Sequence, residues 1–230
     1  MKLSVVIPVY NEAKTIKEIL ARINQVVLPL TKEIIIVDDG STDQTKEILA
    51  DLKVSNCRIF CNENNRGKGA ALRQGFLRAT GDIILIQDAD LEYDPAEYPK
   101  LLEPILTGKA DVVFGSRFIG SEPHRVLYFW HYLGNKFLTI FSNALNNLTL
   151  TDMEVGYKVF SRQALDKILP RLSASRFGIE PEITSRVAQA KLRVYEVGVS
   201  YNGRTYSEGK KINWRDGVAA IWHIIRYSLF

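Results

Sequence analysis

The sequence has few cysteines and no long apolar segment. Cys57 and Cys61 are the only cysteines among 230 residues, and without a second pair they lack the spacing of a zinc site, so we expect reduced thiols. No stretch reaches the roughly 18–20 apolar residues that a membrane-spanning helix requires. The first residues enter a strand-like run without a signal-peptide pattern. These absences predict a cytoplasmic protein that is neither a disulfide scaffold nor an integral membrane protein.

Two common nucleotide-binding motifs are missing as well. The Gly-x-x-x-x-Gly-Lys-Ser/Thr spacing of a P-loop does not occur, and no Gly-x-Gly-x-x-Gly follows the first expected strand. The first absence excludes a P-loop phosphate site, and the second argues against a dinucleotide site of the Rossmann type. Gly67-Lys68-Gly69 precedes an expected helix instead, where backbone N–H groups can meet a phosphate or a base.

A net charge of +4 is distributed unevenly between the two halves of the chain. Hydrophobic residues make up 46% and charged residues 24% of the sequence, which is typical of a globular domain and argues against disorder. Residues 1–115 carry a net charge of −3 and residues 116–230 a net charge of +7. The basic second half suggests an anionic partner, although an uneven surface charge also arises by chance.

Strand and helix patterns alternate through the first half. Apolar runs typical of buried parallel strands occupy residues 3–9, 33–37, 54–60, 82–86 and 111–114. Helical patterns lie between them: a helix capped by Asn11 that runs to Asn24, one that carries Ile48, Leu49 and Leu52, one at 67–79, and one that begins at Asp94-Pro95. The alternation predicts an α/β fold with a mostly parallel, Rossmann-like sheet flanked by helices and joined by right-handed crossovers.

The pattern changes in the second half. Residues 126–148 are aromatic and apolar on most faces, residues 158–169 and 180–190 show helical patterns, and residues 193–199 predict an added strand. No segment rich in Gly, Ser or Pro separates the halves. We therefore expect a single domain over residues 1–230.

Acidic residues collect where three of the expected strands end. Pro8–Glu12, Asp38–Asp43 and Asp88–Glu92 each follow an apolar run. Because the carboxyl ends of parallel strands share one edge of a sheet, these carboxylates are expected to lie together, where they repel one another and raise their pKa values. Oxygen ligands of this kind favour Mg²⁺ or Mn²⁺, which complete their shell with substrate phosphates. We therefore expect a divalent metal and a phosphorylated ligand at this edge.

Two pairs of aspartates have alternative interpretations. Asp88 and Asp90 are two residues apart, so on an extended segment both carboxylates face one site. The alternative is that one forms a turn and the other caps the next helix. The same alternatives apply to Asp38 and Asp39, of which Asp39 is the expected ligand-facing residue.

Four motifs occur in an order and spacing that resemble family-2 inverting glycosyltransferases of the GT-A fold. They are Pro8–Glu12, Val37–Asp43, Asn65–Gly69 and Asp88-Ala89-Asp90. Within the family, the sequence is most similar to dolichyl-phosphate mannose synthases and bacterial polyprenyl-phosphate glycosyltransferases, over nearly the whole chain. The resemblance implies that residues 1–115 bind a nucleotide sugar and that residues 116–230 bind the acceptor.

The resemblance assigns roles to residues of the first half. The nucleotide-binding residues that it implies are Pro8, Tyr10, Glu12, Asp39, Lys68 and Asp88. The metal-binding residues that it implies are Asp88, Asp90 and Glu92, and the implied cofactor is Mg²⁺ or Mn²⁺. Glu92 stands where the family often has Gln, and its extra negative charge is expected to alter the metal preference.

The resemblance also assigns residues of the second half to phosphates. Arg117 matches a residue that receives a lipid phosphate, and Asp152 matches an acid near the reacting centre, where it would orient the acceptor or take a proton from a hydroxyl. Arg204, Lys210 and Lys211 resemble a mobile loop that closes on the donor diphosphate, with Lys210 where Ser is usual. The alternative for each cation is a solvated surface charge.

Two further segments concern the acceptor and the membrane. The family carries polar residues on the helix expected after residue 126, so His131 or Asn135 is expected to touch the acceptor phosphate. Residues 126–130 and 214–230 combine aromatic and aliphatic residues with bordering Arg or Lys, as interfacial helices do; alternatively, both pack on the sheet. We expect peripheral binding to the cytoplasmic leaflet, aided by anionic lipids, with or without a membrane-anchoring partner subunit.

Together these features predict a metal-dependent hexosyltransferase. The expected reaction is inverting transfer of mannose or glucose from a GDP- or UDP-linked donor to a polyprenyl or dolichyl phosphate at a membrane surface. The nearest alternative is a saccharide or other hydroxyl acceptor. A nucleotide-binding subunit without turnover is a further alternative, against which the intact acids and arginines argue. The donor and the lipid phosphate account for the basic half, so no nucleic-acid partner is expected.

Overall fold

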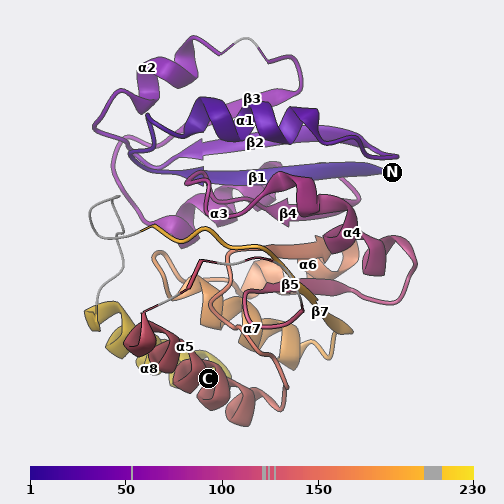
Figure 1. The fold of residues 1–230 in the computed structure, drawn as a ribbon, viewed down its shortest axis with the longest axis vertical. Helices are drawn as coiled ribbons and strands as arrows, with labels where there is room; N and C mark the ends of the chain where they lie inside the picture. Colours follow the sequence, from indigo (N-terminus) through magenta and orange to yellow (C-terminus); the bar gives the residue numbers. More distant parts are fainter. Residues whose placement is uncertain (53, 121–122, 124, 127, 205–213) are drawn as a thin grey trace.

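A seven-stranded sheet forms the centre of the computed structural model, which describes residues 1–230 apart from 53, 121–122, 124, 127 and 205–213 (Figure 1). The strands are β1 (Lys2–Val9), β2 (Thr31–Asp38), β3 (Cys57–Cys61), β4 (Ile83–Ile86), β5 (Val112–Ser116), β6 (Lys158–Ser161) and β7 (Val194–Gly198). The helices are α1 (Ile16–Gln25), α2 (Thr45–Ala50), α3 (Lys68–Arg78), α4 (Tyr98–Leu106), α5 (Phe129–Asn146), α6 (Arg162–Ile168), α7 (Ile179–Gln189) and α8 (Trp214–Leu229), with short 3₁₀ turns η1 (Pro95–Glu97) and η2 (Leu169–Arg171).

Parallel pairing dominates the sheet, whose strand order is β3-β2-β1-β4-β6-β5-β7. β1 pairs in parallel with β2 and β4, β2 with β3, and β5 with β7, whereas β6 is antiparallel to both β4 and β5. The side chains of β4 and of the middle of β1 and β2 are buried, and burial on both faces accounts for their continuous apolar sequences. The predicted α/β fold with a mostly parallel sheet is confirmed.

The expected helix over residues 158–169 is wrong in its first four residues. Lys158–Ser161 form β6, and α6 begins only at Arg162, where the Ser161 side chain accepts a hydrogen bond from the backbone N–H of Ala164. Val159 and Phe160 are fully buried, so pairing within the sheet overrides the local helical pattern. Because β6 is antiparallel, it begins at the edge where β4 and β5 end.

The start of α1 also differs from the expectation. α1 begins at Ile16 rather than directly after Asn11. Asn11 has a φ of 54°, and its side-chain oxygen accepts the backbone N–H of Thr42 at 2.8 Å. Asn11 therefore ties the end of β1 to the end of β2 instead of capping the helix.

The helices α5 and α8 contact each other at the end of the molecule opposite α2 (Figure 1). The outward side chains of α5 are apolar, and Trp130 is 75% and Phe137 56% exposed. Its buried positions are instead the polar residues Thr139 and Ser142. The alternative in which this apolar stripe packs on the sheet is therefore wrong. None of the helices in the described ranges has the length and apolar character needed to cross a bilayer.

Candidate active site

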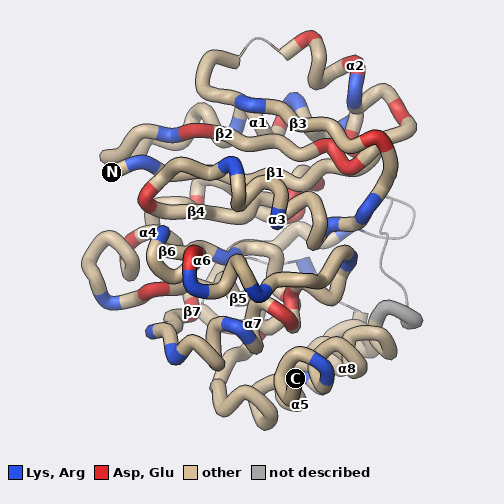
Figure 2. Tube along the Cα trace, turned by 180° about the vertical axis from the view of Figure 1, so that it is seen from behind, with Lys and Arg blue, Asp and Glu red and all other residues tan. Residues whose placement is uncertain are grey.

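The acidic ends of β1, β2 and β4 lie at one edge of the sheet, where Figure 2 shows acidic segments at the ends of β1 and β2 away from the N-terminus (Figure 2). Asp39, which follows β2, accepts the backbone N–H groups of Arg66 at 3.0 Å and Gly67 at 2.6 Å, and the side-chain amide of Asn62 at 2.9 Å. Gly67 has a φ of 97°, and a Cβ there would lie 2.4 Å from the carbonyl oxygen of Ser175. Asp39 thereby holds the glycine-containing motif beside the end of β2.

The expected nucleotide-binding residues of β1 lie at the same edge. Pro8 pairs with Val37 near the end of β1, and Tyr10 follows the strand; both are partly buried. Glu12 is buried, and its carboxylate accepts the Thr15 hydroxyl at 2.9 Å. The fold thus brings Pro8, Tyr10 and Glu12 to the same edge of the sheet as Asp39.

A single guanidinium contacts acids from two of these strand ends. The terminal nitrogens of Arg204 lie 3.4 Å from Glu12 and 3.1 Å from Asp90, and its Nε lies 3.6 Å from Glu92. Burial and the charges of Asp88 and Glu92 nevertheless raise the pKa of Asp90 to about 7. The edge therefore carries more negative charge than Arg204 compensates.

Glu92 has a structural role that accounts for a carboxylate at this position. It accepts the Tyr201 hydroxyl at 2.9 Å and the backbone N–H of Arg204 at 2.8 Å. Its carbonyl oxygen also accepts the backbone N–H of Asn202 at 2.9 Å. Glu92 thus fixes the segment that carries Arg204. Within the described part of the chain, no three His, Cys, Asp or Glu side chains are arranged as a group that could hold a metal.

Asp88 is held from two directions. Lys68 Nζ lies 2.9 Å from its Oδ1, and Gly156 packs so closely that a Cβ there would lie 2.2 Å from its Oδ2. Lys68 also lies 3.0 Å from Glu180 Oε1. Lys68 is therefore positioned beside the end of β4 by two carboxylates, and any larger residue at 156 would displace Asp88.

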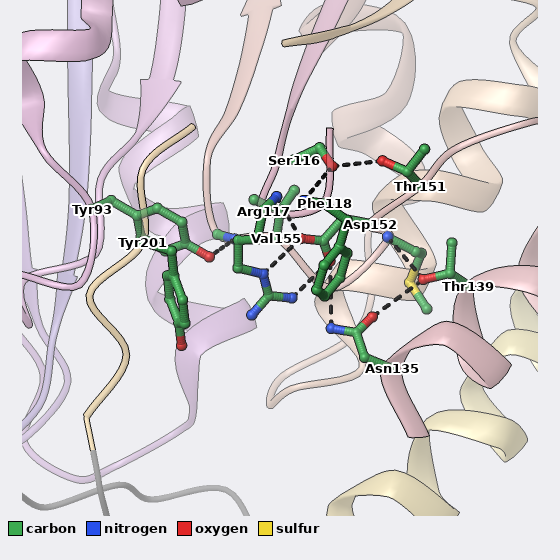
Figure 3. A network of polar contacts seen from close by, with 12 residues as sticks. Tyr93, Ser116, Arg117, Phe118, Asn135, Thr139, Thr151, Asp152, Val155 and Tyr201 are labelled. Atoms are coloured by element: carbon green, nitrogen blue, oxygen red, sulfur yellow. Dashed lines mark hydrogen bonds and ion pairs between the residues drawn. The ribbon is translucent and has the colours of Figure 1, made fainter. Parts of the chain in front are cut away.

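Arg117 and Asp152 form a bidentate pair at the second expected part of the site (Figure 3). Arg117 Nε lies 2.6 Å from Asp152 Oδ2 and Nη2 lies 2.7 Å from Oδ1, while the backbone N–H of Arg117 donates to Oδ2 at 3.1 Å. Asp152 is fully buried, and the Asn135 amide donates to its Oδ1 at 3.4 Å. The two residues that the sequence predicted separately are thus in direct contact, and Asn135 joins them. Of the two polar candidates on α5, His131 packs its ring 5.6 Å from that of Tyr128.

The sequence did not predict three charged residues near the site, which are Lys158, Glu180 and Glu154. Lys158 was treated as the start of a helix, whereas it is a fully buried residue of β6 that contacts Glu180. Glu154 lies two residues after Asp152, and burial followed by the charge of Glu180 raises its pKa to about 7. Its Oε1 is buried without a hydrogen-bond partner. For Lys158, the sequence offered one signal, which is its position directly before the apolar, strand-like pair Val159-Phe160. Lys210 and Lys211 lie outside the described residues.

Arg204 and the Arg117–Asp152 pair lie with the acidic strand ends of a mostly parallel sheet, and ligands of open α/β sheets bind beyond the carboxyl ends of the strands. The model of glycosyl transferase family 2 matches residues 4–169. The chain therefore belongs to glycosyl transferase family 2, and it is a glycosyltransferase. The predicted family is confirmed.

Two curated relatives show how the chain compares in sequence. It is 38% identical over 120 residues to the dolichol-phosphate mannosyltransferase of Pyrococcus furiosus, covering 52% of this chain and 34% of that protein. It is 27% identical to the UDP-N-acetylglucosamine–dolichyl-phosphate N-acetylglucosaminyltransferase of Methanococcus voltae, covering 97% of this chain and 95% of that protein. The chain spans only about a third to a half of several of the curated relatives that it matches.

A solved structure shows the same fold. Glucosyl-3-phosphoglycerate synthase from Mycobacterium tuberculosis, in complex with Mn²⁺, UDP and glucosyl-3-phosphoglycerate, superposes with a TM-score of 0.75 at 23% identity. The match covers 99% of this chain and 80% of that chain. The prediction of a GT-A type fold is thereby confirmed.

Proposed function

We propose that the protein transfers a hexose from a nucleotide sugar to a polyprenyl phosphate at a membrane surface, with inversion at the sugar carbon. The observation that carries the proposal is the position of the Arg117–Asp152 pair beside α5. Asn135 of α5 reaches Asp152, while Trp130 and Phe137 of the same helix are exposed. A phosphate bound by Arg117 would therefore lie next to an apolar surface that suits a lipid chain. The two relatives named for dolichol-linked transfer support the same acceptor class.

The chemistry of an inverting transfer suits these residues. A phosphate oxygen of the acceptor attacks the anomeric carbon, and the bond to the diphosphate breaks, so that its electron pair leaves with the diphosphate. A phosphate monoester is already anionic near neutral pH, with a second pKa of about 6, and needs little help from a base. Asp152 fixes the Arg117 guanidinium, which would hold the acceptor in line. Arg204 and Lys68, which contact Asp90 and Asp88, would neutralise the leaving diphosphate.

The carboxylates that follow β1, β2 and β4, at what we call the donor edge of the sheet, suit a divalent cation. Their oxygens are the ligands that Mg²⁺ and Mn²⁺ prefer, and burial, followed by the charges of Asp88 and Glu92, raises the pKa of Asp90. We assign Asp88 and Asp90 to such a metal, which would neutralise the developing charge of the leaving group when bound. Glu92, which the resemblance implies as a third ligand, is engaged by Tyr201 and Arg204 instead. The solved homologue with Mn²⁺ and UDP supports this assignment. Full transfer activity in Asp90→Ala would contradict it.

The acceptor assay is the principal test. The protein is incubated with Mn²⁺, a polyprenyl phosphate and a panel of labelled GDP- and UDP-sugars. We expect label to enter the organic phase only when polyprenyl phosphate is present, and the panel identifies the sugar and the nucleotide. Label that appears only in water-soluble products would contradict the lipid acceptor.

A peripheral position at the cytoplasmic face of a membrane is part of the proposal. The polar buried face of α5 and its apolar outer face are the reverse of the pattern in a helix that packs on a core. An interfacial helix has this arrangement. A membrane-anchoring partner subunit stays a prediction from the resemblance. Flotation with anionic vesicles at low salt should carry the protein upward, and no co-migration would contradict a membrane-bound position.

A hydroxyl acceptor is the second candidate, and Glu154 favours it. A hydroxyl must lose its proton during transfer, and Asp152 is engaged by Arg117 through both oxygens. Glu154 has a buried oxygen without a partner and a pKa of about 7, which suits a general base at neutral pH. Glu154→Gln separates the candidates: it should reduce transfer to a hydroxyl strongly and transfer to a phosphate little.

A further inference from the structure

Four side chains of alternating charge form a continuous chain of ion pairs that ends at Asp88, the acid assigned to the donor. They are Lys158, Glu180, Lys68 and Asp88. Lys158 Nζ contacts the carboxylate of Glu180, whose Oε1 lies 3.0 Å from Lys68 Nζ. Lys68 Nζ in turn lies 2.9 Å from Asp88 Oδ1. Lys158 is fully buried and Glu180 is 4% exposed. The chain therefore runs from β6 through α7 and α3 to the end of β4, shielded from solvent over most of its length.

Lys158 also fixes the backbone that connects Asp152, the acid on the proposed acceptor side, to the contact with Asp88, the acid on the proposed donor side. Its ammonium donates to the carbonyl oxygens of Val155 at 2.5 Å and Met153 at 3.3 Å. Gly156 follows directly and packs against Asp88 Oδ2. The segment from Asp152 to Gly156 thus begins at the acid that pairs with Arg117 and ends against Asp88, and Lys158 holds the residues between them.

Stability alone does not explain a chain of this kind. Burial of ammonium and carboxylate groups carries a desolvation penalty, and well-packed apolar residues often replace a buried ion pair without loss of stability. What the charges do provide is one defined arrangement, because Glu180 faces two ammonium groups and Lys68 faces two carboxylates. Glu180 also lies outside residues 4–169, the range matched by the family model.

We propose that Glu180 and Lys158 are positioning residues for the transfer reaction. Glu180 holds Lys68 against Asp88. Lys158 holds both Glu180 and the backbone of residues 153–156, so that the donor-side and acceptor-side acids keep a fixed separation. The inference rests on the proposed function, which assigns Asp88 to the nucleotide donor.

Glu182 provides a matched control for Glu180. Both carboxylates are buried on α7, but that of Glu182 accepts the backbone N–H groups of Ser173 at 2.9 Å and Ala174 at 2.7 Å. Titration with GDP and with UDP, each in the presence of Mn²⁺, measures the Kd of each variant. For Glu180→Gln we expect a Kd at least about tenfold above wild type, which corresponds to about 1.4 kcal/mol. Glu182→Gln should lower the Tm and leave the Kd within about twofold of wild type.

A second variant pair tests whether Glu180 acts through Lys68. In a Lys68→Met background, Glu180→Gln should change the Kd by less than about twofold, because the interaction that it supports is already lost. A purely structural role would give the same factor in both backgrounds. Hydrogen exchange at residues 153–156 should rise in Glu180→Gln and Lys158→Met but not in Glu182→Gln. If Glu180→Gln does not fold, the Lys158→Met/Glu180→Gln variant removes both charges of the pair and should show the same weaker binding.

The outcomes separate this inference from the proposed function. Wild-type Kd in Glu180→Gln, or equal effects of Glu180→Gln and Glu182→Gln, would overturn the positioning role and leave the transfer function intact. Failure of the wild-type protein to bind either nucleotide would contradict the proposed donor and, with it, the inference.

Discussion

Replacement of Asp152 by Asn tests the pair at the acceptor end of the site. Asn keeps the shape of the side chain but loses its charge, and its amide group faces a guanidinium that can only donate hydrogen bonds. The buried carboxylate of Asp152 accepts hydrogen bonds from Nε and Nη2 of Arg117, at 2.6 and 2.7 Å. Removal of one partner of a buried ion pair costs on the order of 3–5 kcal/mol, and each kcal/mol shifts the Tm of a domain of this size by roughly 2–4 °C. We therefore expect the Tm to fall by on the order of 10 °C.

An exposed pair with the same bidentate geometry is the control. Arg193 Nη2 lies 2.8 Å from Asp111 Oδ1 and Nε lies 3.1 Å from Oδ2. The side chain of Arg193 is 58% exposed, so water compensates for the loss of its partner. Asp111→Asn should lower the Tm much less than Asp152→Asn does. Thermal unfolding followed by circular dichroism measures both variants.

The Arg117→Met/Asp152→Leu variant separates stability from function. Removal of both charges should restore most of the Tm lost in Asp152→Asn, because neither group is then left buried without a partner. Transfer to polyprenyl phosphate should remain at least about 100-fold below wild type, because the guanidinium that we assign to the acceptor phosphate is absent. A double variant with restored transfer would refute the assignment of Arg117. An unchanged Tm in Asp152→Asn would refute the energetic argument.

Two further predictions concern the segment after Asp152. Folding raises the pKa of Glu154 from 4.5 to about 7, so the folded state keeps a proton that the unfolded state loses, and stability falls as the pH rises between these values. The gain in free energy of unfolding of Glu154→Gln over wild type should therefore be larger at pH 8 than at pH 5, by up to about 3 kcal/mol in urea unfolding. An equal gain at both pH values would contradict a buried Glu154 whose charge is unfavourable. Gly156→Ala places a Cβ 2.2 Å from Asp88 Oδ2. It should raise the Kd for GDP or UDP, titrated in the presence of Mn²⁺, more than about tenfold. Unaltered binding would show that Asp88 moves without consequence.

The sequence predicted the carboxylate edge because its determinants are local. Each acid directly follows an apolar strand, and parallel strands place their ends together. Arg117 and Asp152 were both predicted as site residues, although the sequence did not show that they pair. Their contact depends on the order of β5, β6 and β4, which periodicity alone does not determine.

The buried charge chain could not be predicted for a related reason. β6 has four residues, too few to distinguish a strand from the start of a helix by periodicity. The sequence therefore predicted one helix over residues 158–169 and singled out neither Lys158 nor Glu180. The role of Glu92 was hidden in the same way, because its partners Tyr201 and Arg204 are more than 100 residues away along the chain.

Two arginines of the basic second half are neutralised within the site. Arg117 is paired with Asp152, and Arg204 contacts acids of the first half. The Arg117–Asp152 pair already contributes zero to the net charge of residues 116–230. Arg204 is compensated by acids of the first half, so this net charge overstates the charge that is available to an anionic membrane. The exposed face of α5 offers a different contribution, because the burial of apolar area depends little on ionic strength, whereas the attraction between exposed charges is screened.

This difference makes the membrane prediction specific. If the aromatic face of α5 carries the binding, flotation with anionic vesicles should persist from about 50 to 300 mM NaCl. Trp130→Ser/Phe137→Ser should abolish flotation without lowering the Tm, because these side chains are 75% and 56% exposed and contribute little to the core. Loss of wild-type flotation at the higher salt concentration, with normal flotation of the double variant at low salt, would show that the basic residues carry the binding and that the apolar face of α5 does not.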